Sequence, residues 1–532
     1  MLDMIHALLK EGDDVLVLGS IINLFSFPPR LNEPHLAEPS HVVGDCGFAD
    51  ADHLGQGAHL HLSMRQRRKD PDAAGIAEGA EQFRDMSGRV LIKDIRMGVH
   101  GHSLTSEYMF ICSKNNDSYW LCQAPAHPAI CLMAFSSRVG YNFPGMKLSQ
   151  IIVFLVIVLL VYGSINFYIL RRTRQALADS PVLRWVFFSL FLLLMLAYPA
   201  GRFLERGRGN SISAVVITIG AYYFALMIYL LLAACIIDLF RLGDKLFHFF
   251  PEAVRRDPHR SAELAFFVGV VAAFLTVILG HLNTLHPRFR KLDLKVDKPA
   301  GALQELRIAL ASDIHVGTVT GTETLERIIA RLNSLKPDLV LLPGDVFDED
   351  VSGARAQEVS CLLKSIRAPL GVFACTGNHD YYAGIERCLE NLRLGGVTVL
   401  QDEAVQVAGS FYLLGRRDPA SVRRGERRTP LKDIAAGCDR ALPLVLLDHQ
   451  PLRLEEAAQN GIDLQISGHT HAGQLFPLNL INQLVWKVYW GYSRKGRTQY
   501  YVSCGAGTWG PPVRTGSYPE IVQIRLTFAG GR

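Results

Sequence analysis

Four long apolar stretches dominate the middle of the chain, and basic residues lie in the loops between them. An α-helix rises about 1.5 Å per residue, so roughly 20 residues cross a hydrocarbon core of about 30 Å. Buried helices of a large soluble protein are the alternative interpretation, but four such runs in close succession favour four transmembrane helices. The runs cover residues 151–170, 182–200, 212–237 and 264–279, of which the last is the shortest.

The C-terminal part of the chain has a different pattern, in which short apolar runs alternate with segments of helical periodicity. Parallel strand–helix units come first, and more closely spaced strands follow. This order predicts two sheets packed face to face with helices outside them. The predicted strands are 306–311, 338–342, 371–376, 397–400, 404–407, 411–414, 442–447, 464–467, 500–503 and 521–526, and the predicted helices are 322–335, 353–366 and 385–394.

Length and composition divide the chain into four parts, because 532 residues exceed one ordinary domain. We expect a poorly structured extension over 1–145, four transmembrane helices over 146–285, a basic linker over 286–304 and an α/β domain over 305–528. The extension holds nine of the 18 histidines, so a metal-binding or sensory role is the alternative to disorder. A mis-assigned start is also expected, with Met146 as the natural first residue.

Charge and cysteine usage exclude several classes of protein. A net charge of +5 over this length implies no nucleic-acid partner. The ten cysteines include no CxxC pair, so neither a zinc module nor a disulfide framework is indicated. Basic residues are equally numerous on the two sides of the predicted helices. The positive-inside rule therefore leaves the membrane side of the C-terminal domain undetermined.

Five polar phrases in the C-terminal part carry a candidate metal centre: SDIH, PGDVFD, GNHD, LDHQP and GHTH. Four of them directly follow a predicted strand, and parallel strands present such turns at the carboxyl edge of a sheet. Carboxylate, imidazole and amide groups together suit two divalent cations of intermediate softness, and Asp345 is a candidate to bridge them. The seven candidate ligands are Asp313, His315, Asp345, Asn378, His449, His469 and His471.

On these motifs, residues 306–526 resemble the calcineurin-like metallophosphoesterases. The longer forms GNHDYY and GHTHAGQ are similar to the membrane-associated bacterial branch with the YkuE-type and YaeI-type phosphoesterases. The resemblance implies an α/β fold, a four-layer αββα sandwich here preceded by a four-helix transmembrane bundle, and two divalent ions of Mn, Fe or Zn. It also implies that Asp313, His315, Asp345 and His471 hold one metal, and that Asp345, Asn378, His449 and His469 hold the other.

His379 is the candidate catalytic residue. The resemblance implies that it faces the phosphate rather than a metal, with Asp380 as its orienting partner. Two cations clamp a phosphate and lower the pKa of a water between them. The remaining task for His379 is to protonate the leaving oxygen or to donate a hydrogen bond to the phosphate. A structural histidine is the alternative, and Asp348 is either a partner of a ligand histidine or a helix N-cap.

Three further features concern the substrate. Residues 416–428 contain six arginines, which form either a solvated loop or a site for anionic headgroups. Residues 475–490 are rich in apolar and aromatic side chains, which favour core packing or, alternatively, an acyl-chain groove or an interfacial contact through Trp486 and Trp490. Arg514 is a candidate for phosphate contact.

Together these patterns predict a multi-pass membrane enzyme, a dinuclear-metal phosphoesterase that hydrolyses a phosphodiester or pyrophosphate bond. The bilayer and a phosphoester are its expected partners. A lipid-linked substrate is favoured, and the resemblance adds the UDP-2,3-diacylglucosamine type. One alternative is a general phosphodiesterase for soluble nucleotides. Another is a non-catalytic membrane receptor or scaffold, although a binding module has no need of all seven ligands. A transport role is not indicated, because the apolar spans contain few ionisable residues.

Overall fold

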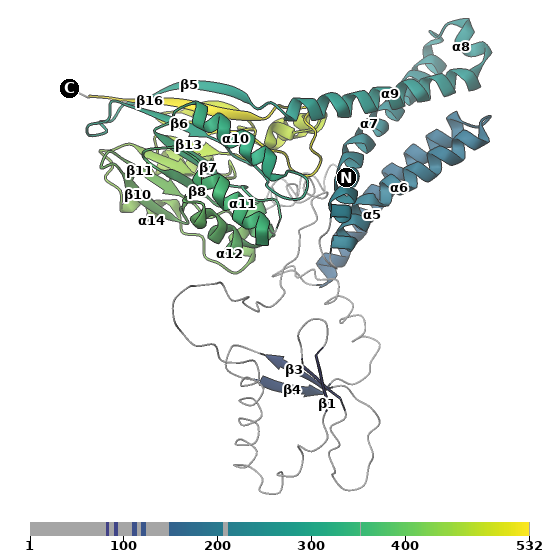
Figure 1. Cartoon of the computed structure of the whole chain (residues 1–532). Coiled ribbons are helices and arrows are strands. Elements are labelled where there is room, and N and C mark those ends of the chain that lie inside the picture. Colours follow the sequence, from purple (N-terminus) through teal and green to yellow (C-terminus); the bar gives the residue numbers. More distant parts are fainter. Residues whose placement is uncertain are drawn as a thin grey trace. The chain divides into compact units, whose positions relative to one another are not determined.

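The computed structural model describes residues 148–205, 211–349, 351 and 353–530, together with four strands in a separate unit of residues 32–141 (Figure 1). The remaining residues of the predicted extension, and Met146, lie outside the described residues, so the interpretation of 1–145 stays a prediction. The four strands form an antiparallel sheet in chain order, namely β1 (Glu81–Arg84), β2 (Val90–Lys93), β3 (Met109–Ser113) and β4 (Tyr119–Gln123).

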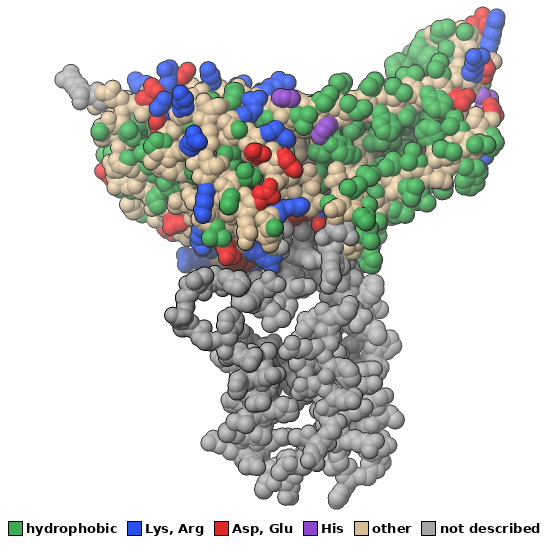
Figure 2. Space-filling view, in the orientation of Figure 1, with side chains coloured by type: hydrophobic (Ala, Val, Ile, Leu, Met, Phe, Trp, Pro, Cys, Tyr) green, Lys and Arg blue, Asp and Glu red, His purple; other side chains and the backbone are tan. Residues whose placement is uncertain are grey.

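Four long helices occupy the four apolar stretches and extend beyond them, in the third case by ten residues. Their outward side chains are large and apolar, since Leu193 is 70% exposed, Leu239 68% and Leu279 65%. Apolar side chains accordingly cover this part of the surface in Figure 2. Each helix is long and apolar enough to cross a membrane, as expected. These membrane helices are α5 (Leu148–Ala176), α6 (Pro181–Glu205), α7 (Ser211–Phe247) and α9 (Pro258–Thr284), with the short α8 (Glu252–Arg256) before the last.

The C-terminal domain contains two six-stranded sheets, ordered β5-β16-β6-β7-β8-β9 and β10-β11-β12-β13-β15-β14. Strands β6 to β9 are parallel in the first sheet, and β11, β12, β13 and β15 are parallel in the second. The first sheet consists of β5 (Arg288–Val296), β6 (Glu305–Leu310), β7 (Leu339–Pro343), β8 (Val372–Cys375), β9 (Thr398–Val399) and β16 (Glu520–Phe528). The second consists of β10 (Glu403–Val407), β11 (Phe411–Gly415), β12 (Leu444–Leu447), β13 (Leu464–Ser467), β14 (Gly491–Lys495) and β15 (Thr498–Val502).

Alternating side chains build the core between these sheets. On β6, Leu306 and Ile308 belong to a cluster shared with the second sheet, whereas Ala309 faces the outer helices. Successive side chains of a strand point to opposite faces, so strands that are apolar at every position are covered on both faces. The expected four-layer αββα sandwich is thereby confirmed (Figure 1). Helices α10 (Thr322–Ser334), α11 (Gly353–Lys364) and α12 (Asn378–Leu394) cover the first sheet, and α14 (Leu431–Ala436) and α15 (Leu454–Gln459) cover the second.

Two edge strands differ from the sequence-based expectation. Strand β5 lies inside the segment 286–304 that we expected to be a linker, and it pairs in parallel with β16. Its sequence, RFRKLDLKV, places charges between apolar residues, which is typical of an exposed edge strand. The same charges are typical of the basic flank of a membrane helix, and for this reason the sequence did not predict a strand here. Strand β14 pairs with β15 at the opposite edge of the second sheet. Because β5 begins at Arg288 and α9 ends at Thr284, the last membrane helix leads into the first sheet within a few residues.

Apolar contacts join the membrane helices to loops at the carboxyl edge of the parallel strands. Val319, in the loop after β6, packs into a cluster of α5, α6 and α7 that includes Tyr198. Leu475 and Val513 pack together with Val277 of α9 in a second cluster, which also contains α7 side chains. The loops that contact the membrane helices are thus continuous with the motif-bearing turns.

Polar contacts reinforce the same junction. Arg202 near the end of α6 forms an ion pair of 2.7 Å with Glu349, and both side chains are largely buried. Asn283 near the end of α9 donates hydrogen bonds to the carbonyl oxygens of Arg514 and Ser517, at 3.0 and 2.9 Å. The ends of two membrane helices are therefore tied to loops that line the candidate site.

Candidate metal centre

The predicted ligands lie at one edge of the sandwich because the strands that precede them are parallel. Asp313 follows β6, Asp345 follows β7, and Asn378 begins α12 directly after β8. In the second sheet, His449 follows β12 and His469 follows β13. Parallel strands bring their carboxyl ends to a common edge. The two sheets face each other, so their two sets of turns meet across the inter-sheet core.

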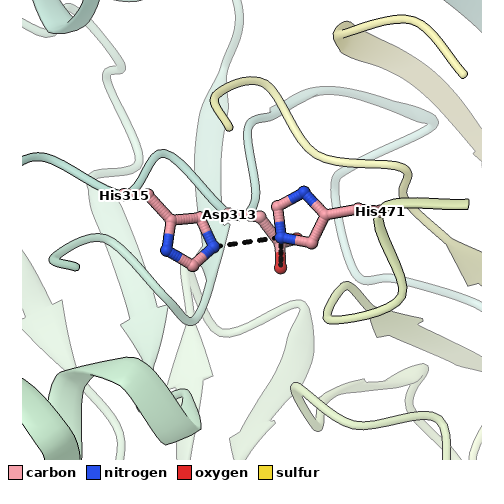
Figure 3. Close-up of side chains that lie close together, drawn as sticks. All are labelled: Asp313, His315 and His471. Atoms are coloured by element: carbon pink, nitrogen blue, oxygen red, sulfur yellow. Dashed lines mark hydrogen bonds and ion pairs between the residues drawn. The ribbon is translucent and has the colours of Figure 1, made fainter. Parts of the chain in front are cut away.

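Asp313, His315 and His471 form one cluster of buried side chains (Figure 3). The Nε2 atoms of His315 and His471 lie 3.0 Å apart. His471 Nε2 lies 3.4 Å from Asp313 Oδ1, and His315 Nε2 lies 3.7 Å from Asp345 Oδ2. Two imidazole nitrogens and two carboxylates therefore point at one small volume. We call this group the His471 half of the centre.

Asp345, His449 and His469 form a second cluster, which we call the His469 half. His449 Nε2 lies 3.1 Å from Asp345 Oδ2, and the rings of His449 and His469 are 5.2 Å apart. Asp345 contributes to both halves, as expected for a shared ligand. The structure thus brings six of the seven predicted ligands into two adjoining clusters.

The side chain of Asn378, the seventh predicted ligand, is buried beside the turns that carry the other ligands. Both side-chain amide atoms of Asn378 are buried, and neither forms a hydrogen bond within the described residues. Buried polar atoms nearly always have partners, so an orphaned pair requires an explanation. A divalent cation accepts carboxylate, imidazole and amide ligands together. The donor set and the orphaned amide are both consistent with two bound cations.

Backbone conformation is strained at the same residues. Asp313, His315, Asp345, His469 and His471 have φ angles of 53°, 56°, 52°, 72° and 48°. Residues other than glycine seldom adopt this left-handed region, and each such residue costs of order 1–3 kcal/mol. Five of the seven predicted ligands therefore carry strain that the surrounding fold must offset. Clustered strain of this kind is typical of a functional site.

Two glycines allow the ligand-bearing turns to approach closely. A Cβ atom at Gly377 would collide with the carboxylate of Asp345, and one at Gly468 would collide with Ser312 and Asp313. A side chain at Gly377 would push the β7 and β8 turns of the first sheet apart, and one at Gly468 would push a turn of the second sheet away from the β6 turn of the first. The glycines before the ligands are thus required by packing across the site.

His379 lies beside the centre and is oriented by Asp348. Its Nδ1 lies 2.9 Å from Asp348 Oδ1, which also lies 3.0 Å from His315 Nδ1. Burial favours neutral His379, but the carboxylates of Asp345 and Asp348 outweigh it and raise the pKa of His379 to about 9. Asp348 is therefore the partner of both histidines. Of the two roles that the sequence allowed for Asp348, the structure favours the partner of a histidine over the helix N-cap.

Asp380 has a different role from the one expected. Its carboxylate accepts hydrogen bonds from the backbone N–H groups of Gly377, Asp345 and Phe347, at 2.8, 3.1 and 3.1 Å. The expected orienting contact with His379 is thus corrected, because the carboxylate points back into the turns. Burial, and then the charge of Asp345, raises the pKa of Asp380 to about 6. Asp380 holds the β7 and β8 turns together.

The histidines of the GHTH phrase are neutral. Burial, followed by the charge of His449, lowers the pKa of His469 to about 3. Burial, followed by the charges of His315 and Arg514, holds the pKa of His471 well below its usual range. Neutral imidazole is the form that binds a metal. These two side chains therefore do not have to lose a proton before they ligate a cation.

Arg514 is buried behind His471, contrary to the expectation that it is available to a phosphate. Its side chain is fully buried, with Nη1 donating to the carbonyl of Cys504 at 2.7 Å and Nη2 donating to the carbonyl of Gly507 at 2.7 Å. Nη2 also lies 3.1 Å from His471 Nδ1. Because these partners already engage the guanidinium inside the protein, the phosphate assignment is corrected. Arg514 instead supports His471 from behind.

The aromatic residues after the GHTH phrase separate into two environments. Trp486 is buried, and its ring lies 5.4 Å from the ring of His469. Trp490 packs on Tyr518 and Arg290. The structure therefore places Trp486 beside the centre, whereas the contacts of Trp490 are with the first sheet and its flanking loop. A role for either residue in binding substrate stays a prediction.

The arginine-rich segment 416–428 is largely engaged by acids. Four of the six arginines form ion pairs, so fewer of them are available to an anionic headgroup than their number in the sequence suggested. Arg423 and Arg427 are exposed. The pairs join Arg416 and Arg428 to Asp448, Arg417 to Glu426, and Arg424 to Glu386.

Comparison with known proteins agrees with this geometry. A family model described as calcineurin-like phosphoesterase matches residues 306–473. A Danio rerio protein named "Transmembrane protein with metallophosphoesterase domain" is 32% identical over 394 residues, which cover 70% of this chain and 88% of the relative. Two bacterial relatives are each named "Uncharacterized metallophosphoesterase". The one from Helicobacter pylori is 29% identical over 69% of this chain and 96% of its own length. The one from Aquifex aeolicus is 33% identical over 48% and 99%.

Proposed function

The chain belongs to the calcineurin-like phosphoesterases, and on that premise we propose that it hydrolyses a phosphodiester or pyrophosphate bond in a lipid-linked substrate. Metal-dependent phosphoester hydrolysis follows from the family. The lipid-linked substrate and the roles of individual residues are the proposal. We also propose residues 305–528, extended by β5, as the catalytic domain.

One observation carries the choice of substrate class. The edge of the sandwich that bears the candidate ligands is the edge that contacts the membrane helices, through Val319, Leu475 and Val513. Val319 lies four residues after His315, and Leu475 lies four residues after His471. A site held at the ends of membrane helices is close to the headgroup layer, where lipid-linked phosphates are concentrated and soluble ones are not. Selectivity then follows from location.

The seven predicted ligands are proposed to hold two divalent cations, with Asp345 shared between the two halves. When bound, such cations polarise a phosphoryl group and lower the pKa of a water held between them. Mn, Fe and Zn all suit this mixed donor set.

His379 is proposed as the general acid. Its ring is kept protonated near neutral pH by Asp348 and Asp345, and its Nδ1 is engaged by Asp348. The free Nε2 is then the atom that can give a proton to the leaving oxygen or hold the phosphate by a hydrogen bond. Tyr382 packs edge-on against His379 at 5.5 Å and restricts rotation of the ring.

The test is hydrolysis by the full chain in lipid nanodiscs, loaded in turn with Mn²⁺, Fe²⁺ and Zn²⁺. Lipid phosphodiesters and pyrophosphates, including UDP-2,3-diacylglucosamine, are compared with soluble nucleotides and a small chromogenic phosphodiester. Asp345→Asn serves as the inactive control. We expect turnover of at least one lipid substrate to exceed that of every soluble one.

Two other outcomes are informative. Preference for soluble nucleotides would favour a general phosphodiesterase and overturn the lipid-linked substrate. Metal binding without turnover of any phosphoester would favour the receptor or scaffold alternative. Trp486→Ser and Trp490→Ser should reduce turnover of the lipid more than that of the chromogenic ester, whereas equal losses on both substrates would point to a packing role.

A further inference from the structure

Exposed apolar side chains of the C-terminal domain are concentrated in one short segment. Among residues 286–528, eight large apolar side chains are exposed, and four of them fall within 476–484. The other four are separated from one another along the chain. The four clustered ones are Phe476, Leu480, Ile481 and Leu484, with exposed fractions of 47%, 49%, 40% and 88%. We call them the α16 patch, after helix α16 (Leu478–Val485).

The inner side of α16 is attached to the metal centre. Asn482 is buried and donates a hydrogen bond of 2.6 Å to the carbonyl of Thr470, which lies between the two GHTH histidines. Trp486, directly after the helix, is the residue that packs against His469. Leu480, Ile481 and Leu484 follow the spacing of one helical face. The helix therefore has a polar anchor on the site side and an apolar outer face, and it contains no charged residue.

The α16 patch is continuous with the junction between the domain and the membrane helices. Leu475 is buried in the cluster with α7 and α9, and Leu478 packs against the same cluster. The Phe476 N–H donates to Thr515 Oγ1 at 3.0 Å, and the hydroxyl of Thr515 is bonded to Tyr229 of α7. Leu475 is thus the last residue buried against the membrane helices before the patch, and the next residue, Phe476, is already exposed.

The position along α9 gives the depth of this junction. Val277, which packs with Leu475, lies seven residues before α9 ends at Thr284. At about 1.5 Å per residue, that is roughly 10 Å along the helix. An apolar helix of this length crosses the hydrocarbon core with its ends in the interfacial layers. The start of the patch is therefore level with the boundary between acyl chains and headgroups.

We propose that the α16 patch inserts into the interfacial layer of the bilayer that surrounds the membrane helices. We infer that lipid covers this face for two reasons. The patch directly adjoins the contact with membrane helices α7 and α9, and it contains no charged residue that would bind a polar partner. Interfacial helices bind in this manner, with the apolar face among acyl chains and the polar face outward. The inference depends on the helices' crossing a membrane and not on the reaction.

Seating α16 in the bilayer would place the partly exposed ligand His469 beside the headgroups. Asn482 and Trp486 connect the inserted helix to the GHTH turn, so the depth of α16 sets the height of the site. A phosphoester at the lipid surface would then reach the centre without leaving the membrane. This consequence joins the patch to the proposed substrate class.

The experiment uses photocrosslinking of the full chain in phosphatidylcholine nanodiscs. Photoreactive benzoylphenylalanine replaces Leu484, whose exposure lets a larger ring be accommodated without disturbing the core. Leu394, 55% exposed at the end of α12, is the matched control in the same domain. Leu279, 65% exposed on α9, is the reference for a side chain within the membrane. Adducts are identified by mass spectrometry.

We expect at least a several-fold excess of lipid adduct at position 484 over position 394, approaching the yield at position 279. Equal lipid labelling at positions 484 and 394 would overturn the proposal. So would a dominant adduct with a second copy of the chain or with the nanodisc scaffold protein, since either would show that protein covers the patch. A soluble substrate in the hydrolysis assay would leave this labelling pattern unchanged, so the two proposals fail separately.

Discussion

The His471 half and the His469 half of the centre differ in what supports their side chains. His471 is backed by Arg514, whose backbone carbonyl is bonded to the end of α9. On the other side, His449 Nδ1 donates to the carbonyl of Pro343 at 2.8 Å, within the sandwich. His471 is therefore tied through Arg514 to the end of a membrane helix, whereas His449 of the other half is held within the two sheets. Partners behind metal-binding histidines orient them and tune their affinity.

The loop after β7, which carries Asp348 and Glu349, is also tied to a membrane helix. Glu349 follows Asp348, the partner of His315 and His379, and is held by Arg202 of α6. Glu349 also accepts a hydrogen bond from the backbone of Thr318. The loops on the His471 side are thus fastened to two membrane helices. Disturbing the helices should affect that half first.

The largest effect is expected where the two halves meet. Asp345→Asn removes a charge from the ligand shared by both clusters, so both cations should be lost. The loss of metal affinity should exceed the roughly 10–100-fold that follows when a hydrogen-bond partner of a metal ligand is removed. Metal content per chain, measured by mass spectrometry, should fall toward zero together with turnover. Retention of one tightly bound cation would show that Asp345 serves only one half.

His379→Ala separates the chemistry from the metals. Turnover should fall roughly 10²–10⁴-fold, the usual contribution of a positioned acid or base. Metal content should stay at the level of the unmodified chain, because His379 is not among the predicted ligands. Steady-state hydrolysis and metal analysis of the same sample give both values. Unchanged turnover would return His379 to a structural role.

Arg202→Gln tests the dependence on the membrane helices. Removing one partner of the buried pair leaves Glu349 uncompensated, so the loop that carries Asp348 should shift. We expect a roughly 10–100-fold loss of turnover, as for other supporting residues around a metal site. The double variant Arg202→Glu with Glu349→Arg restores the pair and should recover much of the activity. Normal turnover of the Arg202→Gln variant would refute the coupling.

The smallest expected effect is a shift in pH dependence. An acid must be protonated, so activity should be present below the pKa of His379 and lost as pH rises through it. Asp348→Asn removes a charge that raises this pKa, and the falling limb should move to lower pH. A hydrogen bond to a charged group contributes about 1.5–3 kcal/mol, which corresponds to about 1–2 pH units.

Asp380→Asn is the control for that shift, because the Asp380 carboxylate is bonded to backbone N–H groups and not to His379. Its kcat profile against pH should keep the falling limb in place. A shift with Asp380→Asn and none with Asp348→Asn would reinstate the orienting role that the sequence suggested.

The amino-acid sequence alone predicted the membrane helices, the fold class and the family. Apolar runs of about 20 residues predict membrane helices because the thickness of the bilayer sets their length. Strand-then-turn motifs predict that Asp313, Asp345 and Asn378 follow neighbouring strands, as they do in the structure, because parallel strands share an edge. These inferences succeed because each rests on residues close together in the chain. Strand β5 was missed for the same reason, since its charges match a local pattern with another meaning.

Tertiary structure alone decided which partner stands behind each functional side chain. Arg202 and Glu349 are 147 residues apart, and Arg514 and His471 are 43 apart. No local periodicity relates such residues, because their contact depends on how separate helices and loops pack. His379 contacts Asp348 and not its neighbour Asp380. The turn into α12 directs the Asp380 carboxylate toward backbone N–H groups that would otherwise lack a partner. Satisfying those buried donors prevailed over proximity in sequence.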